Sequence, residues 1–158
     1  MFRIGFGNDI HRLVAGRPLI IGGVEIESDV GADGHSDADV LLHAITDALL
    51  GAMALGDIGS HFPNTDERWL NAESTVFLRY TLGLIKSHGY EIANIDSTVS
   101  LENIKLRPLI EAMREGIAQA LEVEVSQISI KAKTSEKMDA VGEGKAVRAD
   151  AIVLLTKV

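Results

Sequence analysis

The chain has 158 residues, a net charge of −8 from 15 basic and 23 acidic residues, and no cysteine. This length suits one domain with a real core, so we expect a single domain over residues 1–158, and the acidic balance argues against a surface for nucleic acid or anionic membranes. No disulfide or thiolate ligand is possible, no apolar run approaches a membrane span, and the start of the chain reads as a strand, so the expected location is the cytoplasm.

A strand is predicted over residues 3–11, where Asp9 and His11 are two positions apart. Side chains at this spacing point to the same side of a strand and could serve one ion, although an isolated pair of this kind is more often ordinary surface. A hairpin is predicted over residues 19–26 around a Gly-Gly turn, followed by a loop over residues 27–34.

Residues 34–66 hold three of the five histidines and five aspartates but no lysine or arginine. A helix is predicted over residues 37–53, with Ser36 or Asp37 as its N-cap. His43 lies on this helix, one turn from an aspartate on either side. It is therefore either a histidine at the edge of the core, bonded to one of these aspartates, or a metal ligand that such a carboxylate orients.

The rest of the chain alternates between helices and strands after a long loop over residues 56–66. The predicted elements are helices over residues 73–88 and 108–121, strands over residues 91–101, 126–133 and 146–158, and a polar loop over residues 134–144. This order predicts an α/β fold, a mixed sheet with helices packed on one face. No Walker-type loop or dinucleotide-binding glycine motif is present.

Asp9, His11 and His43 together could form a three-ligand metal site with one coordination position left over. Such an open site suits zinc that must bind a substrate oxygen. A closed structural site would need a fourth ligand, for which His35 is the obvious candidate. The spacing leaves both alternatives open.

Six motifs follow one another along nearly the whole chain: GNDIH at 7–11, HSD at 35–37, His43 with DALLG at 47–51, LGDIG at 55–59, FPNTD at 62–66 and KAKTSEK at 131–137. In this order and at these separations they resemble the 2-C-methyl-D-erythritol 2,4-cyclodiphosphate synthase family of the non-mevalonate isoprenoid pathway. The resemblance implies a homotrimer with active sites between neighbouring subunits. It also implies a cyclising phosphorus–oxygen lyase, in which the 2-phosphate of 4-diphosphocytidyl-2-C-methyl-D-erythritol 2-phosphate attacks the β-phosphorus, releasing CMP and the cyclodiphosphate.

The resemblance implies two divalent metals. Asp9, His11 and His43 would hold zinc, and Glu136 would help to hold magnesium or manganese on the substrate diphosphate. Two cations can align the reacting groups and offset the phosphate charges, which reconciles an acidic chain with a polyanionic substrate. Lysines at 105, 133 and 137 could add positive charge.

The resemblance also assigns the remaining site residues. His35 and Thr134 match positions for transition-state stabilisation. The methylerythritol region would include Ser36, Asp57, Gly59, Phe62 and Asp66. The cytidine and its phosphates would lie against Leu101, Lys105, Leu106, Ala132 and Lys133. The full substrate-binding set further includes Asp9, His11, His35, Thr134, Ser135 and Glu136.

One departure from the family pattern follows the last motif. Many members carry Gly-Phe-x-Gly-Arg there, and this arginine faces the central cavity of the trimer, where anions or isoprenoid phosphates have been proposed to bind. Here residues 138–144 contain no arginine, and Glu143 brings negative charge. The resemblance therefore does not extend to such binding, whereas the metal and phosphate residues are intact.

Two other functions use the same residues. A zinc phosphohydrolase could use the three ligands with Asp57 or Asp66 to activate water. A trimeric binding module with a structural metal would need no catalysis at all.

Overall fold

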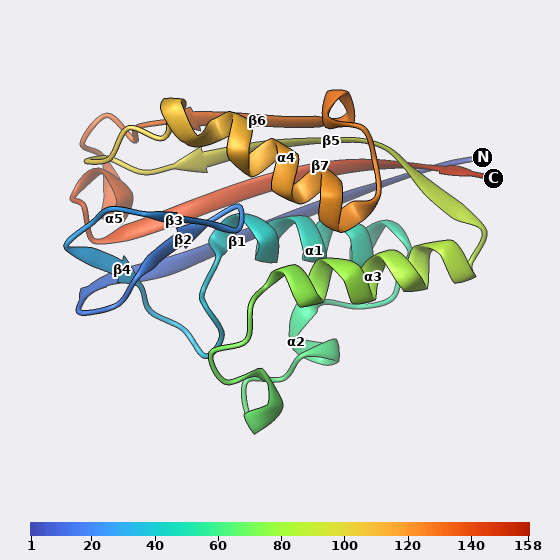
Figure 1. Ribbon diagram of the computed structural model, residues 1–158, viewed down its shortest axis with the longest axis horizontal. Coiled ribbons are helices and arrows are strands. Elements are labelled where there is room, and N and C mark those ends of the chain that lie inside the picture. Colours follow the sequence, from blue (N-terminus) through green and yellow to red (C-terminus); the bar gives the residue numbers. More distant parts are fainter.

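The computed structural model, which describes residues 1–158, contains a five-stranded mixed sheet in the order β4-β1-β7-β5-β6 with helices packed against one of its faces (Figure 1). The strands of this sheet are β1 (Phe2–Ala15), β4 (Val30–Ala32), β5 (Tyr90–Ser100), β6 (Ile128–Lys133) and β7 (Ala146–Lys157). The β5–β6 pair is parallel and the other pairs are antiparallel. A separate hairpin joins β2 (Leu19–Ile21) to β3 (Val24–Ile26). The mixed sheet predicted from the sequence is confirmed.

Three longer helices, α1 (Val40–Ala52), α3 (Thr75–Ser87) and α4 (Ile110–Leu121), lie on the same side of the sheet (Figure 1). Helix α1 covers β1 and β7, α4 lies against β6, and α3 packs against both helices. Short helical turns complete the chain: α2 (Ile58–His61), η1 (Glu67–Trp69), η2 (Arg107–Leu109), η3 (Val125–Gln127) and α5 (Asp139–Gly142). None of the helices combines the length and the apolar character that a membrane crossing requires.

Several short elements differ from the prediction. The loop predicted over residues 27–34 contains β4, which exists because Val30–Ala32 pairs with the end of β1, and β1 itself extends to Ala15. The two predicted loops over residues 56–66 and 134–144 contain α2 and α5. Such short elements depend on partner strands and caps more than on hydrophobic periodicity.

Helix α1 begins at Val40 because Asp39 is its N-cap, so the prediction of Ser36 or Asp37 as the cap was wrong. The Asp39 carboxylate accepts two backbone N–H groups of the helix and two of the Gly22-Gly23 turn, at 2.7–3.1 Å. Burial raises the pKa of Asp39 to about 6, although these backbone donors oppose the shift. The hairpin and the helix start are therefore tied to the same buried carboxyl group.

Two glycines of β1 allow α1 to lie directly on the strand. A Cβ atom would stand 1.8 Å from the carbonyl oxygen of Ala48 at Gly5, and 2.2 Å from that of Ala44 at Gly7. No side chain fits at either position. This close approach brings His43 on α1 to the next inward-facing residues of β1.

The opposite face of the sheet has no covering layer and carries an apolar area on β1 and β7, beside the ion pairs Arg148–Asp150 and Lys131–Asp96. Its large side chains are 52–71% exposed and belong to β1 and β7: Phe2, Ile4, Phe6, Ile10 and Ile152. An uncovered apolar area on a strand face is typical of a surface that another protein covers.

Candidate metal centre and active site

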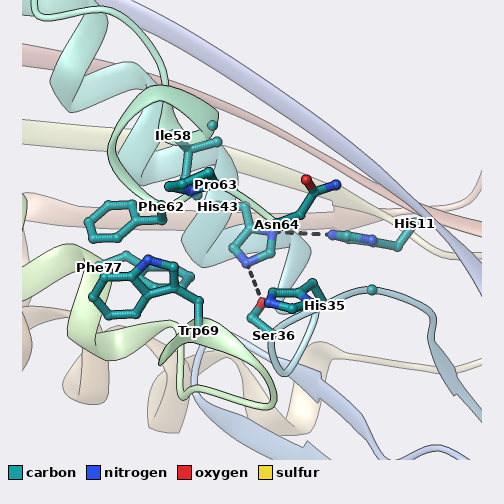
Figure 2. Close-up of a pocket in the computed structure, with 12 residues that line it drawn as sticks. His11, His35, Ser36, His43, Ile58, Phe62, Pro63, Asn64, Trp69 and Phe77 are labelled. Atoms are coloured by element: carbon teal, nitrogen blue, oxygen red, sulfur yellow. Dashed lines mark hydrogen bonds between the residues drawn. The ribbon is translucent and has the colours of Figure 1, made fainter. Parts of the chain in front are cut away.

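A cavity of about 420 Å³ opens beside the start of α1 and is lined by six residues that the sequence analysis selected (Figure 2). These are His11, His35, Ser36, His43, Gly59 and Phe62. Sequence reasoning missed an aromatic wall, in which Phe62 stacks on Phe77 with ring centroids 4.3 Å apart and meets the Trp69 ring edge-on at 5.2 Å. The cavity is therefore polar on the histidine side and apolar on the other.

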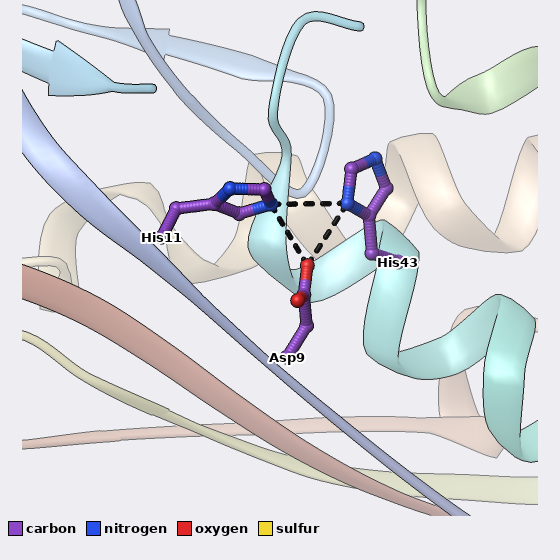
Figure 3. Close-up of side chains that lie close together, drawn as sticks. All are labelled: Asp9, His11 and His43. Atoms are coloured by element: carbon purple, nitrogen blue, oxygen red, sulfur yellow. Dashed lines mark hydrogen bonds and ion pairs between the residues drawn. The ribbon is translucent and has the colours of Figure 1, made fainter. Parts of the chain in front are cut away.

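Asp9, His11 and His43 converge at the edge of this cavity (Figure 3). Asp9 Oδ2 lies 2.8 Å from His11 Nε2 and 2.9 Å from His43 Nδ1, and the two nitrogens are 3.2 Å apart. Tetrahedral zinc with ligand bonds of about 2.0–2.1 Å separates its donor atoms by roughly 3.3 Å, so these three atoms fit the ion after a small expansion. The predicted grouping is confirmed, and the three residues could hold a divalent metal ion.

The Asp9 carboxylate lies within hydrogen-bond distance of both imidazoles. Burial opposes ionisation of Asp9, but hydrogen bonds from His11 and His43 hold its pKa well below the usual range. Burial likewise opposes protonation of His11, yet the hydrogen bond with Asp9 raises the His11 pKa above its ordinary value. A metal ion bound at this site would replace the hydrogen-bonding protons between Asp9 and the two imidazoles.

The second ring nitrogen of His11 is also fixed. His11 Nδ1 lies 2.8 Å from the carbonyl oxygen of Asp33, which can only accept a hydrogen bond. Nδ1 therefore carries a proton, and Nε2, which faces Asp9, is the nitrogen that could bind an ion once its own proton is lost.

His43 is oriented by residues outside its own helix. Neither flanking aspartate side chain bonds the ring, because the Asp39 carboxylate caps the helix and Asp47 accepts the backbone N–H at the start of α2 at 3.0 Å. The His43 ring points toward β1, and its Nε2 lies 2.9 Å from Ser74 Oγ and 3.1 Å from Ser36 Oγ. Neither flanking aspartate therefore orients the His43 ring directly, and its partners at Nε2 are two serine hydroxyls.

His35 is not part of the converging ligand group. Its Nε2 lies 3.0 Å from the carbonyl oxygen of Asp66, so it faces the loop and not the metal position. A closed four-ligand site with His35 is thus not formed, and the three-ligand arrangement stays open toward the cavity.

Asp57 and Asp66 do not line the cavity. Asp57 is exposed and accepts hydrogen bonds from the Ser60 N–H and hydroxyl at 2.8 and 2.6 Å, which lower its pKa. The Asp66 carboxylate binds the Arg68 guanidinium at 2.6–3.1 Å, and this contact lowers its pKa. Both carboxylates therefore bind residues two or three positions further along the chain and do not point into the cavity.

A second hollow of about 500 Å³ lies between residues 101–107 and 132–134. It is lined by all five predicted cytidine-site residues, Leu101, Lys105, Leu106, Ala132 and Lys133, together with Thr134, which was predicted to stabilise the transition state. Arg107 also lines it and was missed by sequence reasoning. This hollow shares no lining residue with the first cavity, so the predicted site is divided into two halves within one chain.

The loop after β6 holds the remaining predicted residues. The Thr134 hydroxyl lies 2.7 Å from Glu136 Oε1, and Glu136 and Lys137 adopt left-handed backbone angles, with φ of 51° and 62°. The carboxylate of Glu102 accepts the backbone N–H groups of Ser135 and Lys137 at 2.9 and 3.1 Å. Glu136 is not among the converging metal ligands, and Glu102, which no local pattern marks, fixes the loop.

The fold and this site define an α/β protein in which an open Asp-His-His group that could hold a metal ion lies beside a cavity. The chain belongs to the YgbB family, whose family model matches residues 2–156, and its relatives are 2-C-methyl-D-erythritol 2,4-cyclodiphosphate synthases, as the motifs indicated. A relative of that name from Geobacillus sp. (strain WCH70) is 54% identical over 157 residues, which are 99% of this chain and 99% of the relative.

Two further relatives show how the chain compares with larger and ligand-bound proteins. The bifunctional enzyme IspD/IspF of Albidiferax ferrireducens is 60% identical over 156 residues, and the match spans 99% of this chain but only 37% of that enzyme. A solved structure of 2C-methyl-D-erythritol-2,4-cyclodiphosphate synthase in a CDP-bound form has a TM-score of 0.90 and 42% identity, covering 98% of this chain and 100% of that chain.

Proposed function

We propose that residues 1–158 form one synthase domain that converts 4-diphosphocytidyl-2-C-methyl-D-erythritol 2-phosphate to 2-C-methyl-D-erythritol 2,4-cyclodiphosphate and CMP. The observation that carries this proposal is the open group of Asp9, His11 and His43 beside a cavity. This group occurs in a chain that is 54% identical, over nearly its whole length, to the 2-C-methyl-D-erythritol 2,4-cyclodiphosphate synthase of Geobacillus sp.. A cytoplasmic location stays a prediction.

The reaction needs positioning more than a protein nucleophile. One phosphorus–oxygen bond forms between the 2-phosphate and the β-phosphorus, and the bond to the CMP phosphate breaks, so the nucleophile belongs to the substrate. Asp9, His11 and His43 would hold a divalent ion, which would supply positive charge for the phosphate oxygens. His35 and Thr134 are the proposed residues for stabilising the transition state.

Zinc is the proposed ion at Asp9, His11 and His43, because two imidazole nitrogens and one carboxylate oxygen suit it. Magnesium or manganese is proposed on the substrate diphosphate with Glu136, because both ions prefer oxygen ligands. Glu136 is exposed and lies beside Thr134, where it could meet a diphosphate.

The assembly is proposed to be a homotrimer with active sites between subunits. The division of the site into two separate hollows supports this, since a neighbouring copy could bring its second hollow to the first cavity. The uncovered apolar face of the sheet gives such copies a surface to bury. The cytidine nucleotide is supported by the CDP complex of the Plasmodium falciparum relative, which has 37% identity and a TM-score of 0.88.

Hydrolysis is the less favoured function. A phosphohydrolase would need a free carboxylate to activate water, but Asp57 and Asp66 are bound by Ser60 and Arg68, and these contacts lower their pKa values. A carboxylate with a lowered pKa is a weak general base.

Cyclisation and hydrolysis differ in their nucleophile, which is a substrate phosphate in the first reaction and water in the second. In oxygen-18 water, we expect phosphorus NMR to show the cyclic diphosphate and CMP without solvent oxygen. Labelled linear phosphates would instead identify a hydrolase. Asp9→Ala should abolish turnover while sedimentation shows an unchanged assembly. A purely structural metal would be indicated if the wild type showed no turnover and His43→Ala lost both the ion and the fold.

Complementation tests the position of the site between subunits. Asp9→Ala removes the metal half and Thr134→Ala removes the loop half, so each variant alone should be inactive. Dissociated, mixed in equal amounts and reassociated, they should recover roughly a quarter of wild-type activity, because that fraction of random interfaces joins two intact halves. No recovery would place the whole site within one subunit.

A further inference from the structure

Ser74 occupies the N-cap position of α3 but does not cap the helix. It is fully buried, and its hydroxyl makes no hydrogen bond to the first turn of α3. Serine at this position normally accepts a backbone N–H group of the following turn. Here the hydroxyl oxygen lies 2.9 Å from His43 Nε2 and is hydrogen-bonded to Asp37 Oδ1. The hydroxyl is thus diverted from the helix to the metal centre.

The donors and acceptors in this group allow one arrangement of protons. The Asp37 carboxylate accepts the Ser74 backbone N–H at Oδ2, at 2.9 Å, and the Ser74 hydroxyl proton at Oδ1. Because a hydroxyl has one proton, Ser74 Oγ can only accept a hydrogen bond from His43. Nε2 must then carry a proton, so Nδ1, which lies 2.9 Å from Asp9 Oδ2, is the nitrogen left to bind an ion.

Ser36 cannot make this selection. Its hydroxyl lies 3.1 Å from His43 Nε2 and accepts the Ala38 N–H at 3.2 Å, but its own proton is bound to no fixed acceptor. It can donate to the ring or accept from it. Of the two serines that reach Nε2, only Ser74, through its bond to Asp37, requires a proton on that nitrogen.

We infer that Ser74 and Asp37 are positioning residues that hold His43 in the Nε2–H tautomer, with Nδ1 turned toward the metal. This inference deepens the proposed function and depends on its metal site. The carbonyl oxygen of Asp33 does the same for His11 through the opposite ring nitrogen. Both imidazole ligands are therefore oriented by the folded chain before an ion binds.

Zinc affinity of the purified full chain tests the inference, measured with zinc alone by competition with a chromophoric chelator. Ser74→Ala should weaken zinc binding by about 10–100-fold, the usual effect of removing a group that orients a ligand. Asp37→Asn should weaken zinc binding similarly. An amide has only one oxygen, so its NH2 group would point at either the Ser74 N–H or the Ser74 hydroxyl proton. Ser74→Thr retains the hydroxyl and should bind zinc more tightly than Ser74→Ala.

Ser87→Ala is the matched control. Ser87 lies at the far end of α3, and its exposed hydroxyl bonds only the Leu84 carbonyl oxygen and the neighbouring His88 ring. Its zinc affinity should equal that of the wild type. The absorption spectrum of the cobalt-substituted protein gives a second readout, because a changed ligand orientation alters the bands of the ion whereas a loss of stability alone does not.

Two outcomes separate the inference from the proposed function. If the wild type binds zinc and Ser74→Ala and Asp37→Asn bind it within twofold, with an unchanged cobalt spectrum, only the inference is overturned. If the wild type binds no zinc, the metal site of the proposed function is wrong and the inference falls with it. Should Ser74→Ala fail to fold, Asp37→Asn and Ser74→Thr decide the question.

Discussion

Alanine at Gly7 should separate helix α1 from strand β1 and so disturb the metal centre. The added Cβ atom would stand 2.2 Å from the Ala44 carbonyl oxygen and 2.5 Å from the Ala48 nitrogen, both part of the helix backbone. Ordinary van der Waals contact begins near 3.4 Å. Because packed interiors have no spare room, the helix must withdraw by about 1 Å.

This displacement has two measurable costs. Overpacking of this kind typically lowers the free energy of unfolding by about 1–3 kcal/mol. His43 moves with α1 while Asp9 and His11 stay on β1, and metal sites tolerate only about 0.2 Å of error in ligand distance. We therefore expect Gly7→Ala to lower zinc affinity by at least about tenfold, a loss of roughly 1.4 kcal/mol.

Gly51→Ala makes the same chemical change on α1 with the opposite expectation. The nearest atom to its Cβ would be the Phe6 carbonyl oxygen at 3.9 Å, an ordinary contact. Alanine in a helix is favoured over glycine by about 0.5–1 kcal/mol, so this variant should be slightly more stable and bind zinc normally. Urea unfolding and chelator competition measure both quantities. A Gly7→Ala protein as stable and as zinc-binding as Gly51→Ala would refute the role assigned to the β1 glycines.

Three further changes test the pH response, the loop and the uncovered face. Because the pKa of His11 is raised and zinc binds only neutral imidazole, zinc affinity should fall by up to about tenfold per pH unit below that pKa and level off above it. Calorimetry in buffers of different ionisation enthalpy would show the released proton, and affinity independent of pH between about 6 and 8 would contradict this. Glu102→Gln turns an amide nitrogen toward a backbone N–H group of residues 134–137, so turnover should fall by about 10–100-fold with zinc affinity unchanged. Unaltered turnover would show that the loop needs no such anchor. Phe6→Asp places a charge on the uncovered face and should convert the assembly to monomers in sedimentation, whereas an intact trimer would put the subunit contacts elsewhere.

Sequence patterns predicted the long elements well because their signals are local. The period-two spacing of Asp9 and His11 correctly placed both side chains on one side of β1. The start of α1 was misplaced because the choice of Asp39 over its neighbours depends on two additional backbone donors from the distant Gly22-Gly23 turn. Strand β4 was missed because three residues carry no usable pattern and pair only with the end of β1.

The candidate metal site was likewise predictable only in part. The residue types of the metal group could be selected from the sequence, but the partners that orient them could not. Ser74 and Asp37 are 37 positions apart, and Asp33 contributes a backbone carbonyl, which any residue could supply. The only local sign was a serine at a helix start, and its ordinary interpretation is a cap.

The same contacts explain why the metal centre is a property of the whole fold. Its ligands come from β1 and α1, the groups that orient them follow β4 and precede α3, and the β1 glycines set the distance between strand and helix. None of these elements could shift by an ångström without moving a donor atom. The loop of Thr134 and Glu136, in contrast, is anchored by Glu102 in a separate hollow that contributes nothing to the metal group. Contacts within one chain therefore fix the three candidate metal ligands, and the remaining site residues lie where a second copy of the proposed assembly could use them.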